Sequence, residues 1–297
     1  MGIKIYNLET SNYETEKVCA ESSLRFLYGN PIGKVALEVL IARALFSRIC
    51  GLWADSKSSA KSIQSFAENN GISIEDSQKK FGEFATFNDF FTRALVDGAR
   101  PVAEPDNKRA ISFPADARHL LIKNISACDT FYTKGQKFNL EKFLSDKKLA
   151  KRFEGGDMLI SRLCPLDYHR FHYPVSGVIA ARRVINGALY SVSPIALSHN
   201  LEIFWQNRRV LNLFETDAFG LVAFVEIGAT NVGSIVNFDN PSTNILRGFE
   251  AGLFRFGGSC VATIFEKSAN IKWISELEEM SAKSIEVYAK VNTLCGK

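Results

Sequence analysis

The sequence predicts an α+β protein, in which a helical N-terminal region packs on a mostly antiparallel β body. Three observations predict it. Apolar residues recur at helical spacing in segment 31–53, short runs rich in Val, Ile and Phe begin near residue 108, and Gly, Pro and Asn turns separate those runs. We therefore expect a helical, membrane-facing region over residues 1–105 and a β-rich domain over residues 106–297.

Length and composition are those of an ordinary folded protein. With 297 residues, 46% of them hydrophobic and 23% charged, the chain can bury a large core. Its net charge of +4 is too small to predict binding to nucleic acid, although it suits an anionic membrane surface. Six cysteines at irregular spacing, with no CxxC pair, favour a reducing compartment. No uncharged apolar run approaches the length of a membrane-spanning helix, so any membrane attachment is expected to be peripheral.

The most hydrophobic early segment, residues 31–53, is the first predicted helix. Its apolar residues stand three and four positions apart, which places them on one face. They are Leu37, Leu40, Ile41, Ala44 and Leu45. Arg43 and Arg48 fall between them, and Trp53 ends the segment. Such a helix can lie in a lipid headgroup layer, and it can equally pack its apolar face on the protein's own core.

The later part of the chain has the pattern of strands and turns. Asn186-Gly187 stands between the apolar runs 177–180 and 188–192, and this dipeptide favours a tight hairpin. Segments 219–238 and 253–265 supply further strands. One helix is expected within the β region, from about Leu140 to Phe153, with Asn139 as its N-cap.

Three short segments hold the polar groups that a nucleophilic reaction needs. They are Phe113-Pro114-Ala115-Asp116, Asp167-Tyr168-His169-Arg170-Phe171-His172 and Phe256-Gly257-Gly258-Ser259-Cys260. A serine hydroxyl becomes a good nucleophile when a histidine takes its proton, and a carboxylate can hold that histidine in the required tautomer. Singly, each segment has an ordinary explanation: a turn aspartate, a surface or metal-binding histidine pair, and a flexible Gly-Gly-Ser turn.

The segments around these residues resemble the phosphatidylserine decarboxylase family, from about residue 20 to 270. Besides the three above, the resemblance is carried by Phe87-Asn88-Asp89-Phe90-Phe91-Thr92-Arg93, Ala99-Arg100-Pro101, Leu189-Tyr190-Ser191-Val192 with Pro194, Asn207-Arg209-Val210 and the run 225–235. The histidine segment followed by a later Gly-Ser is highly specific, whereas Gly-Gly-Ser alone is not. Two positions depart from the family: Ala117 replaces a glycine, and Cys260 replaces a serine or threonine.

The resemblance implies that the chain cuts itself between Gly258 and Ser259, into a large chain of residues 1–258 and a small chain of residues 259–297. In the family's chemistry, His172 accepts the hydroxyl proton of Ser259 while Asp116 orients the imidazole. The hydroxyl attacks the carbonyl of Gly258, and elimination leaves a pyruvoyl group in place of the serine. No external cofactor and no metal is implied.

The same resemblance implies the reaction that follows. The serine amine of phosphatidylserine forms a Schiff base with the pyruvoyl carbonyl, which accepts electrons as carbon dioxide leaves, and phosphatidylethanolamine results. We expect His169 to protonate the resulting carbanion, and Asp167 is an alternative orienting carboxylate. The family is often dimeric, so a homodimer is implied as well.

The expected location is the cytoplasmic face of the cell membrane, with peripheral attachment. Acidic residues at Glu9, Glu14 and Glu16 make the start of the chain unlike an organelle presequence.

Two other functions remain open on the residues alone. A serine hydrolase would use the same Asp116, His172 and Ser259, but Val261 follows Cys260 where the Gly-x-Ser-x-Gly elbow has glycine. A non-catalytic β module that binds lipid would keep the segments only as scaffold.

Overall fold

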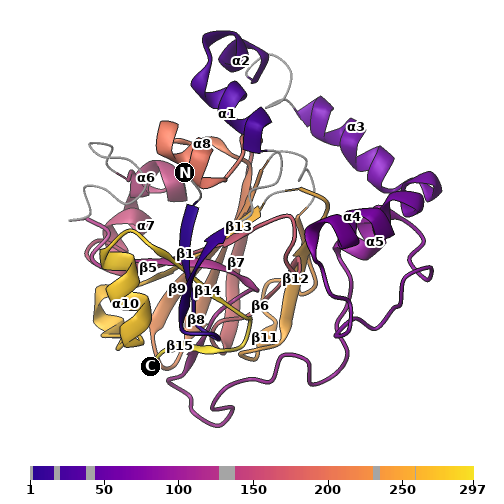
Figure 1. The fold of residues 1–297 in the computed structure, drawn as a ribbon. Coiled ribbons are helices and arrows are strands. Elements are labelled where there is room, and N and C mark those ends of the chain that lie inside the picture. The colour runs from indigo at the N-terminus through magenta and orange to yellow at the C-terminus, as the bar shows by residue number, and fades with distance from the viewer. Residues whose placement is uncertain (1–2, 17–20, 38–43, 127–137, 230–234, 258) are drawn as a thin grey trace.

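The computed structural model describes residues 3–16, 21–37, 44–126, 138–229, 235–257 and 259–297. At its centre is a ten-stranded sheet (Figure 1). In spatial order its strands are β11 (Asn244–Ile245), β7 (Gly177–Ile185), β8 (Arg209–Thr216), β9 (Gly220–Gly228), β13 (Ser259–Phe265), β5 (Asp157–Leu163), β4 (Ala117–Ile122), β14 (Glu286–Ala289), β1 (Ile3–Asn7) and β2 (Asn12–Glu16). Of these neighbours only β1 and β14 run parallel. The predicted α+β class, with a mostly antiparallel sheet, is confirmed.

Two smaller sheets and a set of helices complete the fold. The three-stranded sheet has the order β10 (Ile235–Asn237), β12 (Glu250–Phe254) and β6 (Arg170–His172), and β15 (Leu294–Gly296) pairs with β3 (Ile111–Ser112). The α-helices are α1 (Glu21–Gly29), α2 (Pro31–Ala36), α3 (Ala44–Ala54), α4 (Ile63–Asn70), α5 (Phe87–Phe91), α6 (Leu140–Leu144), α7 (Lys147–Arg152), α8 (Pro194–His199), α9 (Ile203–Gln206) and α10 (Ser275–Ala282).

The large sheet separates two apolar cores, because successive side chains of a strand point to opposite faces. On β13, Val261 and Phe265 join the first core, whereas Ala262 and Ile264 join the second. Residues of β6, β12 and α10 complete the first core. Residues of α1, α6, α8 and α9 complete the second. Ser259 precedes Val261 by two positions, so its side chain belongs to the face that the three-stranded sheet covers.

A third, smaller core lies outside the large sheet and is rich in phenylalanine. It gathers Ala54, Ile63, Ala67, Phe84, Phe87, Phe90 and Phe91, from α3, α4, α5 and the segment before α5. Helix α5 begins at Thr86, whose hydroxyl accepts a hydrogen bond from the backbone N–H of Asp89 at 3.1 Å. This core therefore holds α5 in place beside the catalytic body.

The N-terminal region is only partly as predicted. Helix α2 and helix α3 occupy both ends of the expected helix 31–53, while residues 38–43, with Leu40, Ile41 and Arg43, lie outside the described residues. The region is not helical from its start, because residues 3–16 form a hairpin that extends the large sheet. The parallel pairing of β1 with β14 supplies backbone partners from the far end of the chain, which local sequence does not reveal.

Two predictions of local structure are wrong in part. Segment 188–192 forms no strand, because the Asn207 side chain takes up the backbone N–H and C=O of Tyr190 at 2.9 and 2.8 Å. Strand β7 pairs instead with β8. The helix expected from Leu140 to Phe153 is broken at Ser145, which has a φ of 49°, and Asp146 caps a second helix. The N-cap at Asn139 is confirmed by its 2.8 Å bond to the N–H of Lys142.

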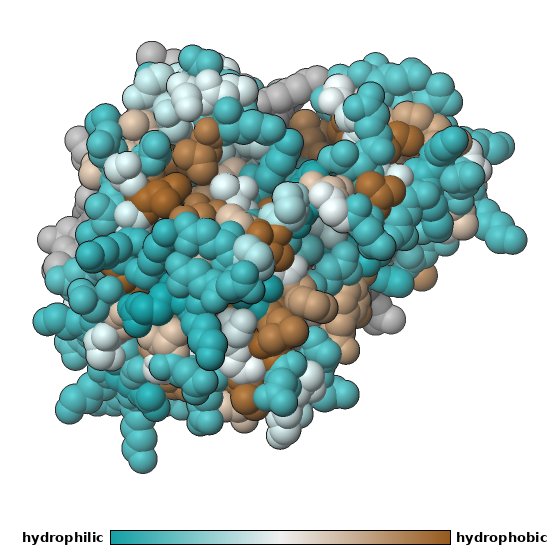
Figure 2. Space-filling model, turned by 90° about the horizontal axis from the view of Figure 1, so that it is seen from below, coloured by the Kyte–Doolittle hydropathy of each residue, from teal (hydrophilic) through white to brown (hydrophobic). Residues whose placement is uncertain are grey.

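Two features are relevant to membrane attachment: the length and apolar character of the helices, and the hydropathy of the surface. Among the described residues, none of the helices has both the length and the apolar character needed to cross a bilayer. The end of the molecule seen from below, opposite α1 and α2, is largely hydrophilic, with apolar residues in small groups (Figure 2).

Candidate active site

Ser259 stands at the first position of β13, in the interior of the protein. It pairs in register with Leu163 of β5 and Gly228 of β9, and its side chain is fully buried. Gly257, two residues earlier, has a φ of 141°, a backbone conformation that side-chain-bearing residues rarely adopt. Gly258, the expected cleavage position, lies outside the described residues. The chain thus enters β13 through a turn that depends on glycine, directly before the candidate nucleophile.

His169 is the histidine that contacts Ser259. Its Nδ1 lies 3.4 Å from the Ser259 Oγ, and its Nε2 lies 3.0 Å from the carbonyl oxygen of Cys164. A carbonyl only accepts, so Nε2 carries the proton and Nδ1 offers its lone pair to the serine hydroxyl. The ring stacks on Phe91 at 3.8 Å between centroids. Burial, assisted by the nearby charge of Arg93, lowers the pKa of His169 to about 3, so its imidazole is neutral at physiological pH.

His172 lies on β6, three residues further, and has different partners. Its Nδ1 donates to the carbonyl of Gly248 at 2.8 Å, which leaves the lone pair on Nε2. Tyr168 Oη is 3.4 Å from that Nε2, but its proton goes to Glu250 at 2.9 Å. Burial lowers the pKa of His172, while the charges of Glu250 and Asp116 oppose the shift. The Nε2 of His172 therefore remains able to accept a proton.

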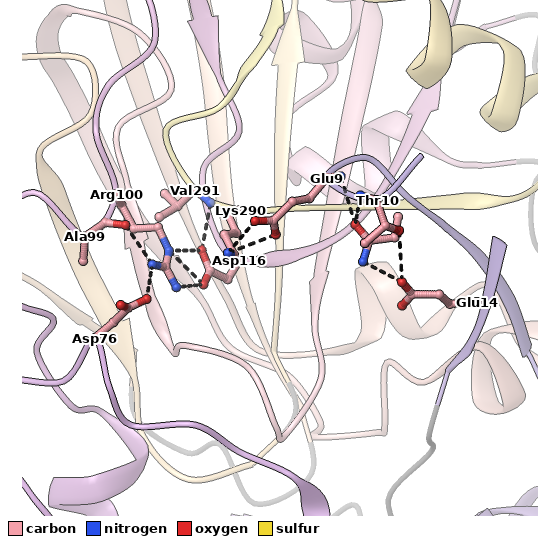
Figure 3. A network of polar contacts seen from close by, with 10 residues as sticks. Glu9, Thr10, Glu14, Asp76, Ala99, Arg100, Asp116, Lys290 and Val291 are labelled. Carbon is pink, nitrogen blue, oxygen red and sulfur yellow. Dashed lines mark hydrogen bonds and ion pairs between the residues drawn. The ribbon is translucent and has the colours of Figure 1, made fainter. Parts of the chain in front are cut away.

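Asp116 lies between Arg100 and the backbone of Val291, in the segment that joins β14 to β15 (Figure 3). Its carboxylate accepts from Arg100 Nη2 and from the N–H of Val291, both at 2.8 Å. Arg100 also reaches Asp76 at 2.8 Å. Among the described residues no hydrogen bond joins Asp116 to His172 or His172 to Ser259. The described structure thus shows an electrostatic effect of Asp116 on His172, but not the hydrogen bonds of the expected triad.

Asp167, the alternative orienting carboxylate, contacts neither histidine. It accepts from the backbone N–H of Cys164 at 2.6 Å and forms an ion pair with Arg118. Burial raises its pKa in spite of that pair. The carbonyl of the same Cys164 accepts the hydrogen bond from His169 Nε2. Asp167 therefore affects His169 indirectly, by holding the backbone of Cys164 in place.

The segment 87–93 contributes residues to which the sequence assigned no role. Asn88 Oδ1 accepts from the N–H of Phe256 at 2.8 Å, and Asn88 Nδ2 donates to Asp55 at 2.8 Å. Phe91 stacks on His169, and the Thr92 carbonyl accepts from Arg170 at 3.0 Å. The segment therefore holds both the chain leading to Ser259 and the histidine segment. The motif was visible in the sequence, but its contacts depend on tertiary packing.

Cys260, one of the two departures from the family pattern, points away from Ser259. It is fully buried in the second core, opposite Arg162 and Ile227 in register.

We expect Cys260→Ser to change the rate of self-cleavage by no more than about twofold, because its side chain is on the other face of the sheet. The free energy of unfolding should fall by about 1–3 kcal/mol, since a buried hydroxyl would need a partner. Gel analysis of cleavage and urea denaturation test both; a tenfold change in cleavage would contradict this placement.

The described residues contain no group of three or more His, Cys, Asp or Glu side chains placed to hold a metal ion.

Comparison with known proteins gives concordant matches. A family model described as phosphatidylserine decarboxylase matches residues 87–288, which include Asp116, both histidines and Ser259. Three similar proteins carry the name phosphatidylserine decarboxylase proenzyme. That of Fusobacterium nucleatum is 42% identical over 90% of this chain and 88% of its own length. That of Clostridium perfringens is 39% identical over 99% of both chains, and that of Chlamydia trachomatis is 37% identical over 98% of this chain and 96% of its own.

Proposed function

The chain belongs to the phosphatidylserine decarboxylase family, and from this premise we propose that Ser259 is the residue where its precursor is cut and the pyruvoyl group forms. Its activity is the decarboxylation of phosphatidylserine to phosphatidylethanolamine and carbon dioxide. The observation that supports Ser259 is its position: fully buried, after a glycine turn, with its Oγ 3.4 Å from a neutral imidazole.

The surroundings of Ser259 fit a pyruvoyl group. Once formed, such a group supplies an electrophilic carbonyl that withdraws electrons from a bound amino acid. The chain's own residues keep water from position 259, since Ser259 and His169 are both fully buried. Phe91 and the Cys164 carbonyl hold the imidazole beside this position.

Two histidines are candidates for the base in self-cleavage. His169 is closer to the hydroxyl, but burial and the charge of Arg93 lower its pKa to about 3. Burial lowers the pKa of His172 as well, but there the charges of Glu250 and Asp116 oppose the shift. We assign the base to His172, whose Nε2 must then come within hydrogen-bond distance of the Ser259 hydroxyl.

His169 is assigned to the later proton transfer to carbon. It lies beside position 259, where the substrate's α-carbon must come during the reaction. Phosphatidylserine brings negative charge into this buried site, and a nearby anion raises the pKa of an imidazole. His169 thus becomes able to hold a proton when the substrate is bound.

The proposed division into chains of residues 1–258 and 259–297 places β13 in the small chain. Because β13 pairs along its whole length with β5 and β9, both in the large chain, the two products should remain associated after the cut. Mass spectrometry under denaturing conditions tests the function: two chains, the small one with a ketone at its terminus, are expected. An intact chain that never forms a ketone would contradict it. The implied homodimer is checked separately by light scattering.

We propose peripheral membrane contact through the helices of the N-terminal region. Ile32 on α2 and Ile49 and Leu52 on α3 are 74%, 58% and 71% exposed, respectively. Leu40 lies outside the described residues. Trp53 packs on Phe256 at 6.3 Å, which ties α3 to the chain leading to Ser259.

Replacing Ile49 and Leu52 together by serine should lower binding to phosphatidylglycerol vesicles at least about tenfold, because two apolar side chains no longer enter the lipid. Sedimentation with vesicles measures it, and phosphatidylglycerol avoids occupation of the active site by substrate. Val184→Ser, on the large sheet and 52% exposed in the native chain, is the matched control and should bind normally. Equal binding by all three proteins would place the membrane contact elsewhere.

A further inference from the structure

We propose that Arg93 binds the phosphodiester of the phosphatidylserine headgroup and so sets the position of the substrate at the active site. The inference rests on the proposed function of Ser259. It concerns a residue that takes part in neither self-cleavage nor proton transfer as assigned above.

Arg93 is a buried cation without an ion pair. Its side chain belongs to a residue that is 8% exposed, and within the described part of the chain its one hydrogen bond is from Nη1 to the Phe90 carbonyl at 3.4 Å. Among the described residues, buried Arg162 pairs with Glu16 at 2.7 Å, while buried Arg209 and Arg247 form no ion pair but donate three or more hydrogen bonds each to carbonyl or serine oxygens. Arg93 has neither arrangement. Burying a charge without an ion pair costs several kcal/mol, so a guanidinium with a single long hydrogen bond is suited to receive an anionic ligand.

The neighbours of Arg93 in the chain contact the reaction centre. Its guanidinium lies over the Phe90 ring, 5.2 Å from the centroid. Phe91, two residues earlier, stacks on His169, and the intervening Thr92 is bonded to Arg170. The positive charge of Arg93 contributes to the lowered pKa of His169, and Asp116 and Asp167 act electrostatically on Arg93 without pairing with it. The cation therefore lies close to the pair formed by His169 and Ser259, with donor groups still free.

The substrate offers two anions, its carboxylate and its phosphodiester. The carboxylate loses its charge as carbon dioxide leaves, so a cation on it would stabilise the reactant more than the transition state and slow the reaction. The phosphodiester keeps its charge throughout. Only the β-carbon and one ester oxygen separate its phosphorus from the α-carbon, so a guanidinium near His169 is within reach of it. Arginine also suits the paired oxygens of a phosphate.

The test compares two substrates in the variant Arg93→Gln. One is phosphatidylserine, and the other is the ether of serine with diacylglycerol, which keeps the amine and carboxylate but lacks phosphate. We expect the KM for phosphatidylserine to rise about ten- to a hundredfold, because a charged hydrogen bond made equally throughout the reaction is lost. The KM for the ether should be the same as in the native enzyme. Loss of the Arg93 charge also raises the pKa of His169, and any change in kcat that this causes should be the same for both substrates. The melting temperature should not fall, because no ion pair is removed.

Arg109→Gln is the matched control, since Arg109 donates to the carbonyls of Ala218 and Ala269 away from this site, and it should leave the kinetics for both substrates unchanged. An equal rise in KM for both substrates in Arg93→Gln would assign Arg93 to the carboxylate or to structure. A folded, uncut Arg93→Gln would assign it to processing. Either result overturns the proposal. If Arg93→Gln does not fold, Arg93→Lys is measured instead, and a rise in KM confined to phosphatidylserine is required. Pyruvoyl content is measured first, because its absence from the native protein would refute the proposed function and not the role of Arg93.

Discussion

Ser259→Ala is expected to leave a single uncut chain of 297 residues with no measurable decarboxylase activity. Alanine offers neither the oxygen that attacks the preceding carbonyl nor the source of the pyruvoyl carbonyl, so both processing and turnover lose their reacting atom. A denaturing gel, a ketone-specific hydrazide label and carbon dioxide release from phosphatidylserine measure the three consequences in one preparation.

The chain contains a matched control for this experiment. Ser161 is also fully buried on a neighbouring strand, and its Oγ lies 2.9 Å from Nδ1 of His119. Ser161→Ala removes a buried serine from a histidine without touching position 259, so it should still be cut and active, with a lower melting temperature. A cut, active Ser259→Ala protein would refute the assignment of Ser259. Failure of both variants to be cut would show a general loss of folding.

His172→Ala and His169→Ala should fail at different steps. Without its base, His172→Ala is expected to cut itself about a hundredfold more slowly or worse, since general base catalysis contributes at least that much. His169→Ala should still be cut, at least in part, but should turn over phosphatidylserine poorly, because the carbanion lacks its proton donor. Quantifying cut chain by gel and carbon dioxide release per pyruvoyl group separates the two effects.

This pair of variants also shows which histidine is the base in self-cleavage. If His169→Ala stays uncut while His172→Ala cuts normally, the histidine that contacts the hydroxyl is the base in spite of its low pKa. If both variants cut and decarboxylate at the native rate, the histidine segment is structural and the mechanism fails. His199→Ala serves as the control for the loss of a histidine, since His199 is exposed at the end of helix α8.

The sequence by itself determined the fold class and the family, and it supplied the candidates for the reacting residues. These follow from local signals: the period of apolar residues, the turn residues between strands and the order of specific segments along the chain. The Asn139 cap is another such signal, because the donor it satisfies is only three residues away.

Only the tertiary structure decided which of those residues meet. It brought His169 to Ser259, paired Asp116 with Arg100 and buried Arg93 where none of the described residues forms an ion pair with it. It also paired β1 of the first hairpin with β14, and it bonded the backbone of Tyr190 in segment 188–192 to the Asn207 side chain, so that this segment forms no strand. The physical reason is the same in each case. Hydrogen bonds, burial and electrostatic shifts arise between groups that are distant in sequence, so their partners and energies exist only after the chain has folded.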